Sequence, residues 1–358
     1  MASSKDADAS TVPVLKDLTI ENITENVHRI NSQCSDPRLK YVMERLVSHL
    51  HDFARETRLS FDEWMTGIQF LTQVGQICTD VRQEFILLSD IVGLSLLVDS
   101  IDHPKPPSST EGTVLGPFHT HDAPSDSNGT SISADPDGEA LLVLCTVKTT
   151  AGKPVPDVKV DVWETDSHGK YDVQYENRGD KADGRAVIRS DKDGVFWFKG
   201  IVPVPYPIPN DGPVGKLLEK LGRHCWRPSH MHFMFEKEGF DNLVTALYVR
   251  GSDYETSDAV FGVKESLIVS LDTVTAEQAK TYHVQEGSKL LKYDFVLVTD
   301  DETKQLRHDE AVKAMKTLGR EGMMIVNGLP VPEVAYESRS NAEISTELFD
   351  HVHQVVKV

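Results

Sequence analysis

The chain has 358 residues, of which 39% are hydrophobic and 26% are charged, and its formal net charge at pH 7 is −19. This length and composition can bury one large core plus a smaller appended unit, as in an ordinary soluble enzyme. The negative charge repels nucleic-acid phosphates and anionic lipids, which argues against nucleic acid as a partner.

The cysteines and the start of the chain indicate the compartment. Cys34, Cys78, Cys145 and Cys225 lie far apart with no C-x-x-C pair, as expected for free thiols in a reducing environment. The opening MASSKDADAS is polar and acidic, unlike a signal or transit peptide, and the longest apolar run is too short to span a bilayer. We therefore expect a cytoplasmic protein with a disordered N-terminus over residues 1–13 and no membrane span.

Residues 14–103 show the apolar spacing of helices. Ser60 and Glu63 have the spacing of a capping box, which satisfies the first free N–H groups of a helix. Pro104 and the prolines after it cannot continue a helix and mark the end of this region. The apolar positions at helical spacing are Ile23, Val27, Ile30 and Cys34, then Leu39, Val42, Met43, Leu46, Val47 and Leu50.

Residues 104–300 form a series of short β-branched and aromatic segments separated by turn formers. Many short strands at this spacing indicate a β-sandwich. We therefore expect a mainly β protein, in which an antiparallel β-sandwich follows the N-terminal α-helical region. The predicted strands are residues 141–148, 158–164, 194–200, 230–235, 243–249 and 293–299.

One helix is expected to interrupt these strands. Asp211 is the predicted N-cap, Pro213 suits the first turn, and Gly222 can end the helix. Residues 301–358 are mixed and polar, carry no recognisable motif, and are interpreted as a C-terminal extension.

The most informative segment is GRHCWRPSHMHFMF, residues 222–235. His230 and His232 form a His-x-His pair, and alternate side chains of a strand share one face, so both imidazoles can reach one metal ion. Tyr171 and Tyr206 lie upstream, each in a turn-rich segment next to a predicted strand end. Two phenolates and two imidazoles make a hard, anionic ligand set that favours ferric iron.

Five segments in this order resemble the intradiol ring-cleaving dioxygenases, and within that family the hydroxyquinol 1,2-dioxygenases. The resemblance runs from about residue 20 to about residue 300. It implies one Fe(III) per chain with Tyr171, Tyr206, His230 and His232 as ligands. The matching segments are EFILLSDIVGLSLLVD (84–99), TVLGPFH (113–119), VDVWETDSHGKYD (160–172), PVPYPIPNDGPVGKLLEKLGRHCWRPSHMHF (203–233) and SDAVFGVKESL (257–267).

The resemblance also implies a substrate pocket. Periodicity alone would make its residues ordinary helix core and turn positions. Asp90 is the most telling, because a carboxylate in an apolar stretch needs a partner, and the third hydroxyl of a trihydroxybenzene could be that partner. Ala246 stands where catechol-cleaving members carry a polar side chain. The implied pocket residues are Leu87, Asp90, Val114, Leu115, Gly116, Phe118 and Val260.

The implied reaction is the insertion of both atoms of O2 into hydroxyquinol, with ring opening to 3-hydroxy-cis,cis-muconate or maleylacetate. Tyr206 would act as general base and Arg227 would stabilise anionic substrate, although an arginine by itself more commonly pairs with a carboxylate. His224 is interpreted as a surface hydrogen-bonding residue. Related enzymes dimerise through their N-terminal helices around a bound lipid, so the helical region is expected to form a homodimer interface.

Three alternatives remain open at this point. The substrate could be catechol or a chlorocatechol. The strands also suit a non-catalytic transthyretin-like binding module, although such a module does not require Tyr206 or the histidine pair. A zinc or copper site on the same histidines is a further possibility, but zinc prefers His, Cys and carboxylates to two phenolates. Charge transfer from tyrosinate to iron(III) would colour the purified protein wine-red, which distinguishes a dioxygenase from the binding module and from a zinc or copper site.

Overall fold

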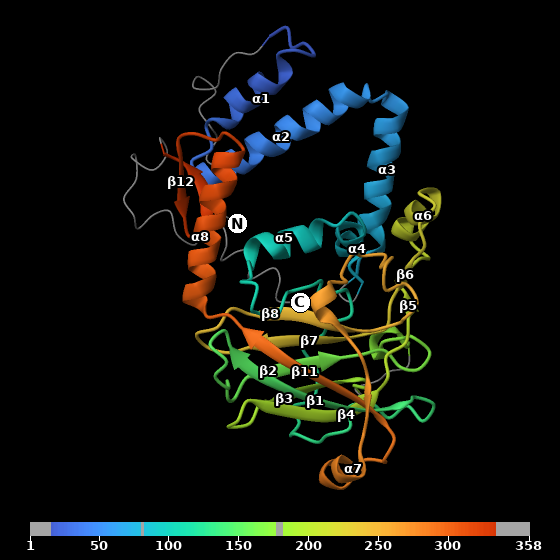
Figure 1. Ribbon diagram of the computed structural model, residues 1–358. Helices are drawn as coiled ribbons and strands as arrows, with labels where there is room; N and C mark the ends of the chain where they lie inside the picture. Colours follow the sequence, from blue (N-terminus) through green and yellow to red (C-terminus); the bar gives the residue numbers. More distant parts are fainter. Residues whose placement is uncertain (1–15, 80–81, 177–181, 334–358) are drawn as a thin grey trace. The chain divides into compact units, whose positions relative to one another are not determined.

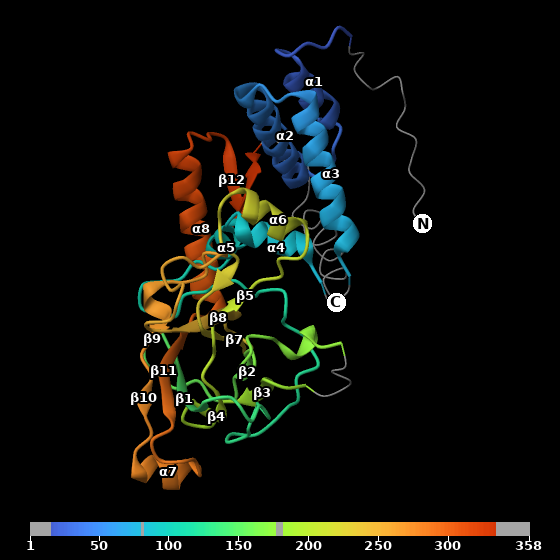
Figure 2. The ribbon, with the colours of Figure 1, turned by 90° about the vertical axis from the view of Figure 1, so that its right-hand side faces the viewer.

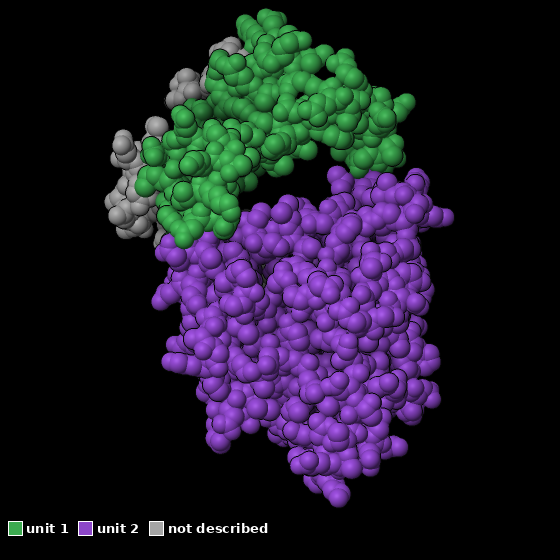
Figure 3. Space-filling view, in the orientation of Figure 1, with its two compact units in different colours: residues 1–69, 308–358 green, residues 70–307 purple. Residues whose placement is uncertain are grey.

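The computed structural model describes residues 16–79, 82–176 and 182–333. The chain divides into two compact units, Met1–Gln69 with His308–Val358, and Phe70–Arg307 (Figure 3). The predicted disorder of residues 1–13 falls outside the described residues. Across the described part of the chain, no helix is long and apolar enough to cross a membrane.

The first unit is built on helices. Asp36 caps α2, because its side chain accepts hydrogen bonds from the N–H groups of Arg38 and Leu39. The Arg38 guanidinium donates to the carbonyl oxygen of Pro330 at 2.9 Å and ties a C-terminal hairpin to α2. The elements are α1 (Ile23–Asn31), α2 (Pro37–Thr57), the start of α3 (Phe61–Ile77), the end of α8 (Asp300–Thr317), β12 (Met323–Val326) and β13 (Leu329–Pro332).

The predicted capping box is confirmed at the start of α3. The N–H of Glu63 donates to the hydroxyl oxygen of Ser60 at 3.2 Å, and the N–H of Ser60 donates to the Glu63 carboxylate at 2.9 Å. The two bonds satisfy free donors at the helix start, which is why this helix begins at Phe61.

The second unit contains two large sheets and a small two-stranded one, with α4, α5 and α6 near one end and α7 near the other (Figures 1 and 2). Its helices are α4 (Glu84–Ile91), α5 (Leu94–Asp102), α6 (Pro213–Lys220) and α7 (Ala276–Tyr282), with 3-10 turns η2 (Asp172–Gln174) and η3 (Glu265–Leu267). Its strands are β1 (Ala140–Thr149), β2 (Lys159–Trp163), β3 (Arg185–Arg189), β4 (Val195–Ile201), β5 (Tyr206–Pro207), β6 (Trp226–Arg227), β7 (His230–Glu236), β8 (Leu243–Val249), β9 (Ile268–Val269), β10 (Asp272–Thr273) and β11 (Lys289–Leu297).

The two sheets have the strand orders β10-β11-β1-β4 and β3-β2-β7-β8-β9. Val143 of β1, Phe196 of β4, Val160 of β2 and Phe233 of β7 belong to one buried hydrophobic cluster, so both sheets contribute to the same core. This core holds the strand that carries the two predicted histidine ligands.

The fold prediction needs two corrections. The sheets are mixed rather than wholly antiparallel, because β1 pairs with β11 and β8 pairs with β9 in parallel. Apolar alternation shows which side chains face the core, but it does not fix the direction of the neighbouring strand. The described helices together also hold more residues than the described strands, so "mainly β" fits the region of the sheets and not the whole chain.

The predicted helix between the strands is confirmed as α6, with Pro213 in its first turn. Its N-cap is Gly212 and not Asp211. The Asp211 carboxylate instead accepts two hydrogen bonds from Arg82, both at 2.9 Å. The Asp211 carboxylate therefore pairs with an arginine from outside the helix and does not cap α6.

Candidate functional site

The two histidines lie on the face of β7 that points away from the main core. Met231 and Phe233, which alternate with them, are fully buried in the core shared by the two sheets. The Nε2 atoms of His230 and His232 lie 3.1 Å apart, and both side chains are almost completely buried. The predicted His-x-His geometry, with both imidazoles directed to one place, is therefore present.

Different contacts orient the two imidazole rings. The Nδ1–H of His230 donates to the carbonyl oxygen of Pro228 at 2.7 Å, which places the lone pair of the neutral ring on Nε2, the atom that would bind a metal. The Nδ1 of His232 is buried and has no partner among the described residues. Its ring is instead stacked on Trp163, with centroids 4.7 Å apart and planes within 3°. Stacking on Trp163 therefore orients the His232 ring, whereas a hydrogen bond to Pro228 orients the His230 ring.

Burial keeps both histidines neutral. It lowers the pKa of His230 to about 3, and the nearby Arg227 guanidinium acts in the same direction. Burial, followed by the proximity of His230 and Arg227, also holds the pKa of His232 well below its usual value. Neutral imidazole is the form that binds metals.

Tyr171 and Tyr206 complete the group. Their hydroxyl oxygens are 3.4 Å apart, and the Tyr206 ring lies 5.3 Å from the His230 ring. Gly169, with φ +74°, makes the preceding turn, and a Cβ at that position would lie 3.0 Å from the Cβ of Tyr206. Burial, and then the neighbouring Tyr206, hold the pKa of Tyr171 well above its usual value. Two phenol oxygens and two imidazole nitrogens therefore converge.

Arg227 lies at the centre of this group, beside Tyr206 in the β5–β6 pairing. It donates from Nη1 to Nε2 of His230 at 3.0 Å and to the Tyr206 hydroxyl at 3.4 Å. Its Nε and Nη2 form a two-point ion pair with Asp258, at 3.0 and 3.2 Å. The Nε2 lone pair that accepts from Arg227 is the one that a metal would use.

The structure places most of the predicted pocket residues next to this group. Four of them share a buried cluster with Tyr171 and Tyr206: Leu87, Val114, Phe118 and Val260. The ring of Phe118 is stacked on Tyr171, with centroids 4.8 Å apart. A Cβ added to Gly116 would come within 3.8 Å of Nε2 of His232, so its backbone approaches a predicted ligand closely. Leu115 is different, because it is 41% exposed and lies outside the cluster.

Asp90 is buried on α4. Burial raises its pKa above the usual value, while the Ser95 hydroxyl and the charge of Arg227 oppose this rise. A cavity of about 420 Å³ borders this cluster at Leu87, Phe118 and Ile208, but neither Asp90 nor any of the four predicted metal ligands lines it.

Three contributing residues were missed from the sequence. Asp258 holds Arg227, the Tyr248 hydroxyl accepts from Arg227 at 3.1 Å, and Trp163 stacks on His232. Asp258 carried a usable signal, since it is a carboxylate beside the apolar residues Ala259, Val260 and Phe261. The prediction for His224 is confirmed, because it is exposed and its Nδ1 accepts from the N–H of Trp226 at 3.1 Å.

The donor set limits what could bind here. Over the residues that the structure describes, no group of three or more His, Cys, Asp or Glu side chains could hold a metal ion. A metal at His230 and His232 would therefore depend on the phenol oxygens of Tyr171 and Tyr206, which are hard ligands suited to a hard cation.

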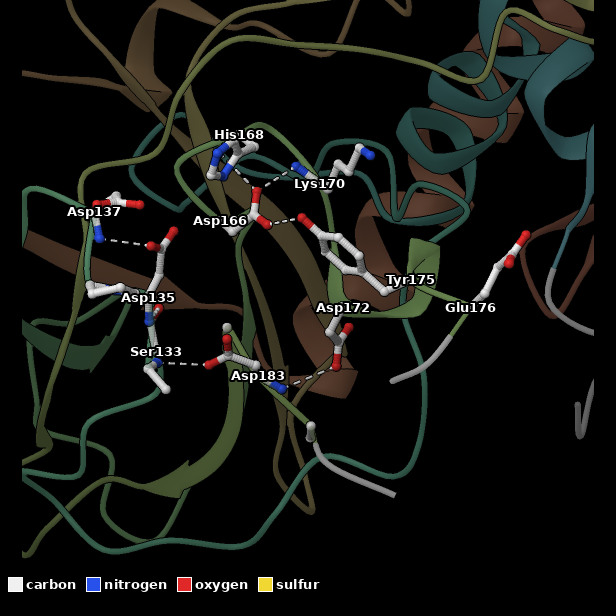
Figure 4. A pocket seen from close by; sticks show the side chains of 14 residues that line it. Ser133, Asp135, Asp137, Asp166, His168, Lys170, Asp172, Tyr175, Glu176 and Asp183 are labelled. Atoms are coloured by element: carbon white, nitrogen blue, oxygen red, sulfur yellow. Dashed lines mark hydrogen bonds between the residues drawn. The ribbon is translucent and has the colours of Figure 1, made fainter. Parts of the chain in front are cut away.

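A second cavity, of about 690 Å³, lies elsewhere in the same unit and contains many carboxylates (Figure 4). Several of these carboxylates bind neighbours within the protein. Asp166 accepts hydrogen bonds from the N–H groups of His168 and Lys170, and Asp172 pairs with Arg185 (Figure 4 shows the Asp166 bonds). None of the four predicted metal ligands lines this cavity, so it is separate from the site described above.

Comparison with known proteins points to one family. The family model described as "Dioxygenase" matches residues 114–299, and "Catechol dioxygenase N terminus" matches residues 36–110. The intradiol ring-cleavage dioxygenase hqdA of Aspergillus niger is 69% identical over 323 residues, which cover 90% of this chain and 98% of that protein. The 6-chlorohydroxyquinol 1,2-dioxygenase of Cupriavidus pinatubonensis is 46% identical, over 77% of this chain and 96% of that protein.

Solved structures give the same result. Hydroxyquinol 1,2-dioxygenase from Pseudomonas putida DLL-E4 aligns with a TM-score of 0.72 and 41% identity, over 78% of this chain and 99% of that chain. The 3-chlorocatechol 1,2-dioxygenase from Rhodococcus opacus 1CP aligns with a TM-score of 0.63 and 27% identity, over 73% and 98%. With the family models, the similar sequences and the site geometry in agreement, this chain belongs to the intradiol ring-cleavage dioxygenases, a family of oxidoreductases.

Proposed function

We propose that the protein opens the ring of hydroxyquinol (benzene-1,2,4-triol) between its two adjacent hydroxylated carbons, and that both atoms of O2 enter the product. The product is 3-hydroxy-cis,cis-muconate, or its tautomer maleylacetate. The observation that carries this proposal is the convergence of two phenols and two imidazoles beside a buried arginine. The names of the similar hydroxyquinol dioxygenases support the choice of substrate.

We propose that one Fe(III) per chain is held by Tyr171, Tyr206, His230 and His232. The donor set fits this ion, because the histidines are neutral and the two phenol oxygens are hard ligands. When bound, ferric iron acts as a Lewis acid toward the two adjacent substrate oxygens and makes the ring reactive toward O2.

The side chains around this centre have separate roles in the proposal. The phenolate oxygen of Tyr206 accepts a proton from one substrate hydroxyl, as a general base. The Arg227 guanidinium, fixed by Asp258, stabilises negative charge on the substrate while the ring opens. Burial of both groups excludes water, which strengthens these interactions because the local dielectric constant is low.

The proposed pocket wall consists of the predicted residues. Asp90 is the member that would select hydroxyquinol, because its buried carboxyl group, which already contacts the Ser95 hydroxyl, could also pair with the third hydroxyl of the substrate. Leu87, Val114, Phe118 and Val260 supply apolar surface, and Gly116 leaves room beside His232. Leu115, at 41% exposure, could contribute only at the rim.

We predict that Asp90→Ala lowers the preference for hydroxyquinol over catechol while iron content stays unchanged. A substrate hydroxyl that pairs with a buried polar group can be selected by up to about 10⁴-fold, and the variant removes that group. The measurement is kcat/KM for hydroxyquinol, catechol and chlorocatechols with wild type and variant. Asp135→Ala, in the separate acidic cavity, is the control. An unchanged ratio, or wild-type enzyme that cleaves catechol equally well, would refute this role of Asp90.

The alternative functions have distinct outcomes when these turnover measurements are combined with metal analysis of the purified protein. Preferred turnover of catechol or a chlorocatechol would replace the substrate and keep the reaction. Stoichiometric zinc in active protein would contradict the proposed metal. No turnover of any diol by iron-loaded protein would leave a transthyretin-like binding module as the better explanation.

We also propose a homodimer formed through the N-terminal helices, with a bound lipid at the interface. Apolar side chains on one side of α2 are exposed, and exposed apolar surface of this kind marks interfaces. The exposed α2 side chains are Val42 (40%), Leu46 (48%), Leu50 (56%) and Phe53 (53%).

The proposed cytoplasmic location is supported by the four free cysteines.

We predict that Leu46→Glu with Leu50→Glu converts the dimer to a monomer, because two buried carboxylates would then face an apolar partner. Light scattering at micromolar concentration should give the mass of two chains for wild type and of one chain for the variant. Val312→Glu, at an exposed position of α8, should remain dimeric. Organic extraction followed by mass spectrometry should release the lipid from wild type. A monomeric wild type would contradict this assembly.

A further inference from the structure

Arg223 joins two elements of the proposed substrate pocket. Its Nη1 donates to the carbonyl oxygen of Ile91 at 2.7 Å, and its Nη2 donates to the carbonyl oxygen of Ala259 at 2.8 Å. Ile91 follows Asp90 at the end of α4, and Ala259 precedes Val260 in the loop 258–262. One guanidinium therefore connects the main chain beside two proposed pocket residues.

The contact at α4 is favourable for two reasons. The last carbonyl groups of a helix have no partner within the helix, and Ile91 supplies one of them. The C-terminal end of a helix also carries partial negative charge, which attracts a cation. Arg223 thus satisfies an acceptor that α4 itself leaves free.

Arg223 is held on a rigid support. Its backbone N–H donates to the carbonyl oxygen of Leu218 at 2.9 Å, at the end of α6. At the other end of α6, the N–H of Val214 donates to the buried carboxylate of Glu84 at 3.1 Å, in the first turn of α4. Helix α6 is therefore attached to both ends of α4, and the Arg223 guanidinium extends this support to the loop 258–262.

The loop itself is held between two arginines. Asp258, which pairs with Arg227, also accepts from the N–H groups of Val260 at 3.3 Å and Gly262 at 2.9 Å. Gly262 has no space for a side chain, because a Cβ there would lie 2.9 Å from Nη2 of Arg227. Arg227 thus fixes the loop on the side of the metal ligands, and Arg223 fixes it on the side of α4.

Phe261 shows that this loop conformation is costly. It is a bulky residue with φ +62°, a backbone conformation that is unfavourable for a side chain of this type. Its ring lies under the Arg223 guanidinium, 5.0 Å from centroid to Cζ. The ring also lies 3.7 Å from the position that a Cβ on Gly93 would occupy. Arg223 therefore contacts the strained residue directly.

We propose that Arg223 is a specificity-determining positioning residue, which fixes the distance between the end of α4 with Asp90 and the loop 258–262 with Val260. The proposal rests on the proposed function, since it assigns these two residues to the pocket wall. Selection of a substrate hydroxyl by Asp90 requires an accurately placed carboxyl group, and a displacement of about 1 Å can cost on the order of 100-fold in rate.

The test compares Arg223→Ala, Arg223→Lys and a surface control, Arg189→Ala, whose partner Asp157 is also exposed. Arg223→Ala is expected to lower the ratio of kcat/KM between the two diols that wild type distinguishes best by at least about tenfold. Iron content and the tyrosinate absorption band should not change. Arg223→Lys, which keeps the charge but can reach only one carbonyl, should recover part of the ratio. Arg189→Ala should behave like wild type.

Hydrogen exchange separates this proposal from the proposed function. Peptides covering residues 88–93 and 258–263 should exchange faster in Arg223→Ala, and by less in Arg223→Lys, whichever diol is the substrate. Faster exchange with an unchanged substrate ratio would overturn the role in specificity. Unchanged exchange would overturn the connection itself. Failure of wild type to turn over any diol would refute the proposed function and, with it, the specificity role.

Discussion

Replacing either His230 or His232 by alanine is expected to remove iron, colour and ring-cleaving activity together. Each supplies one of two neutral imidazoles whose Nε2 atoms lie 3.1 Å apart, and no other histidine is within hydrogen-bonding distance of that pair among the described residues. Loss of a group that merely supports a ligand typically costs 10–100-fold in metal affinity, so loss of a ligand should cost at least about 100-fold.

The comparison that tests this prediction uses a third histidine from the same segment. His224→Ala should keep iron at one per chain and full colour, because His224 is exposed and its Nδ1 accepts from the N–H of Trp226, away from the histidine pair. Metal analysis and visible absorption of the three variants provide the measurement. Iron retained at one per chain in both His230→Ala and His232→Ala would contradict the proposed ligand set.

The second large effect is expected at Arg227. Removing a donor that stabilises a developing negative charge typically lowers kcat by about 10²–10³, and Arg227→Met is predicted to do so. The same change leaves the buried Asp258 without its cation, and breaking a buried ion pair in this way typically costs about 3–5 kcal/mol of stability. Arg227→Met should therefore lose both activity and thermal stability.

A double variant separates these two effects. Arg227→Met with Asp258→Asn removes the unpaired charge but keeps an oxygen that can accept from the N–H groups of Val260 and Gly262. We expect it to recover most of the lost stability, measured by thermal unfolding, while kcat stays as low as in the single variant. Recovery of kcat along with stability would mean that Arg227 only supports the fold.

The strands and the shared face of His230 and His232 could be predicted because local patterns determine them. Residues 243–249 form β8 with the predicted bounds, since β-branched and aromatic residues there are bounded by turn formers. His230 and His232 share a face because the side-chain period of a strand is two. Ala246 lies opposite His232 in the pairing of β7 and β8, which places it beside the histidine pair.

The parts that were missed depend on contacts between distant residues. The parallel pairing of β1 with β11 joins segments from opposite ends of the unit, and no local pattern specifies it. The stacking of Trp163 on His232 follows from the pairing of β2 with β7. Helix α8 was not predicted because its sequence has no apolar stripe. Within the described structure it buries only Thr303, so packing did not require such a stripe. The β12–β13 hairpin did carry a signal, since Asn327-Gly328 is a favoured hairpin turn.

The most direct test of ring cleavage between the two hydroxylated carbons is the product formed from hydroxyquinol under isotopically labelled O2. Purified, iron-loaded protein should convert the triol to a ring-opened diacid, and mass spectrometry of the promptly trapped product should find both labelled oxygen atoms in it. A semialdehyde would show cleavage beside the two hydroxyl groups, and a product whose new oxygen comes only from water would show that the protein is not a dioxygenase. Either result would contradict the proposed reaction.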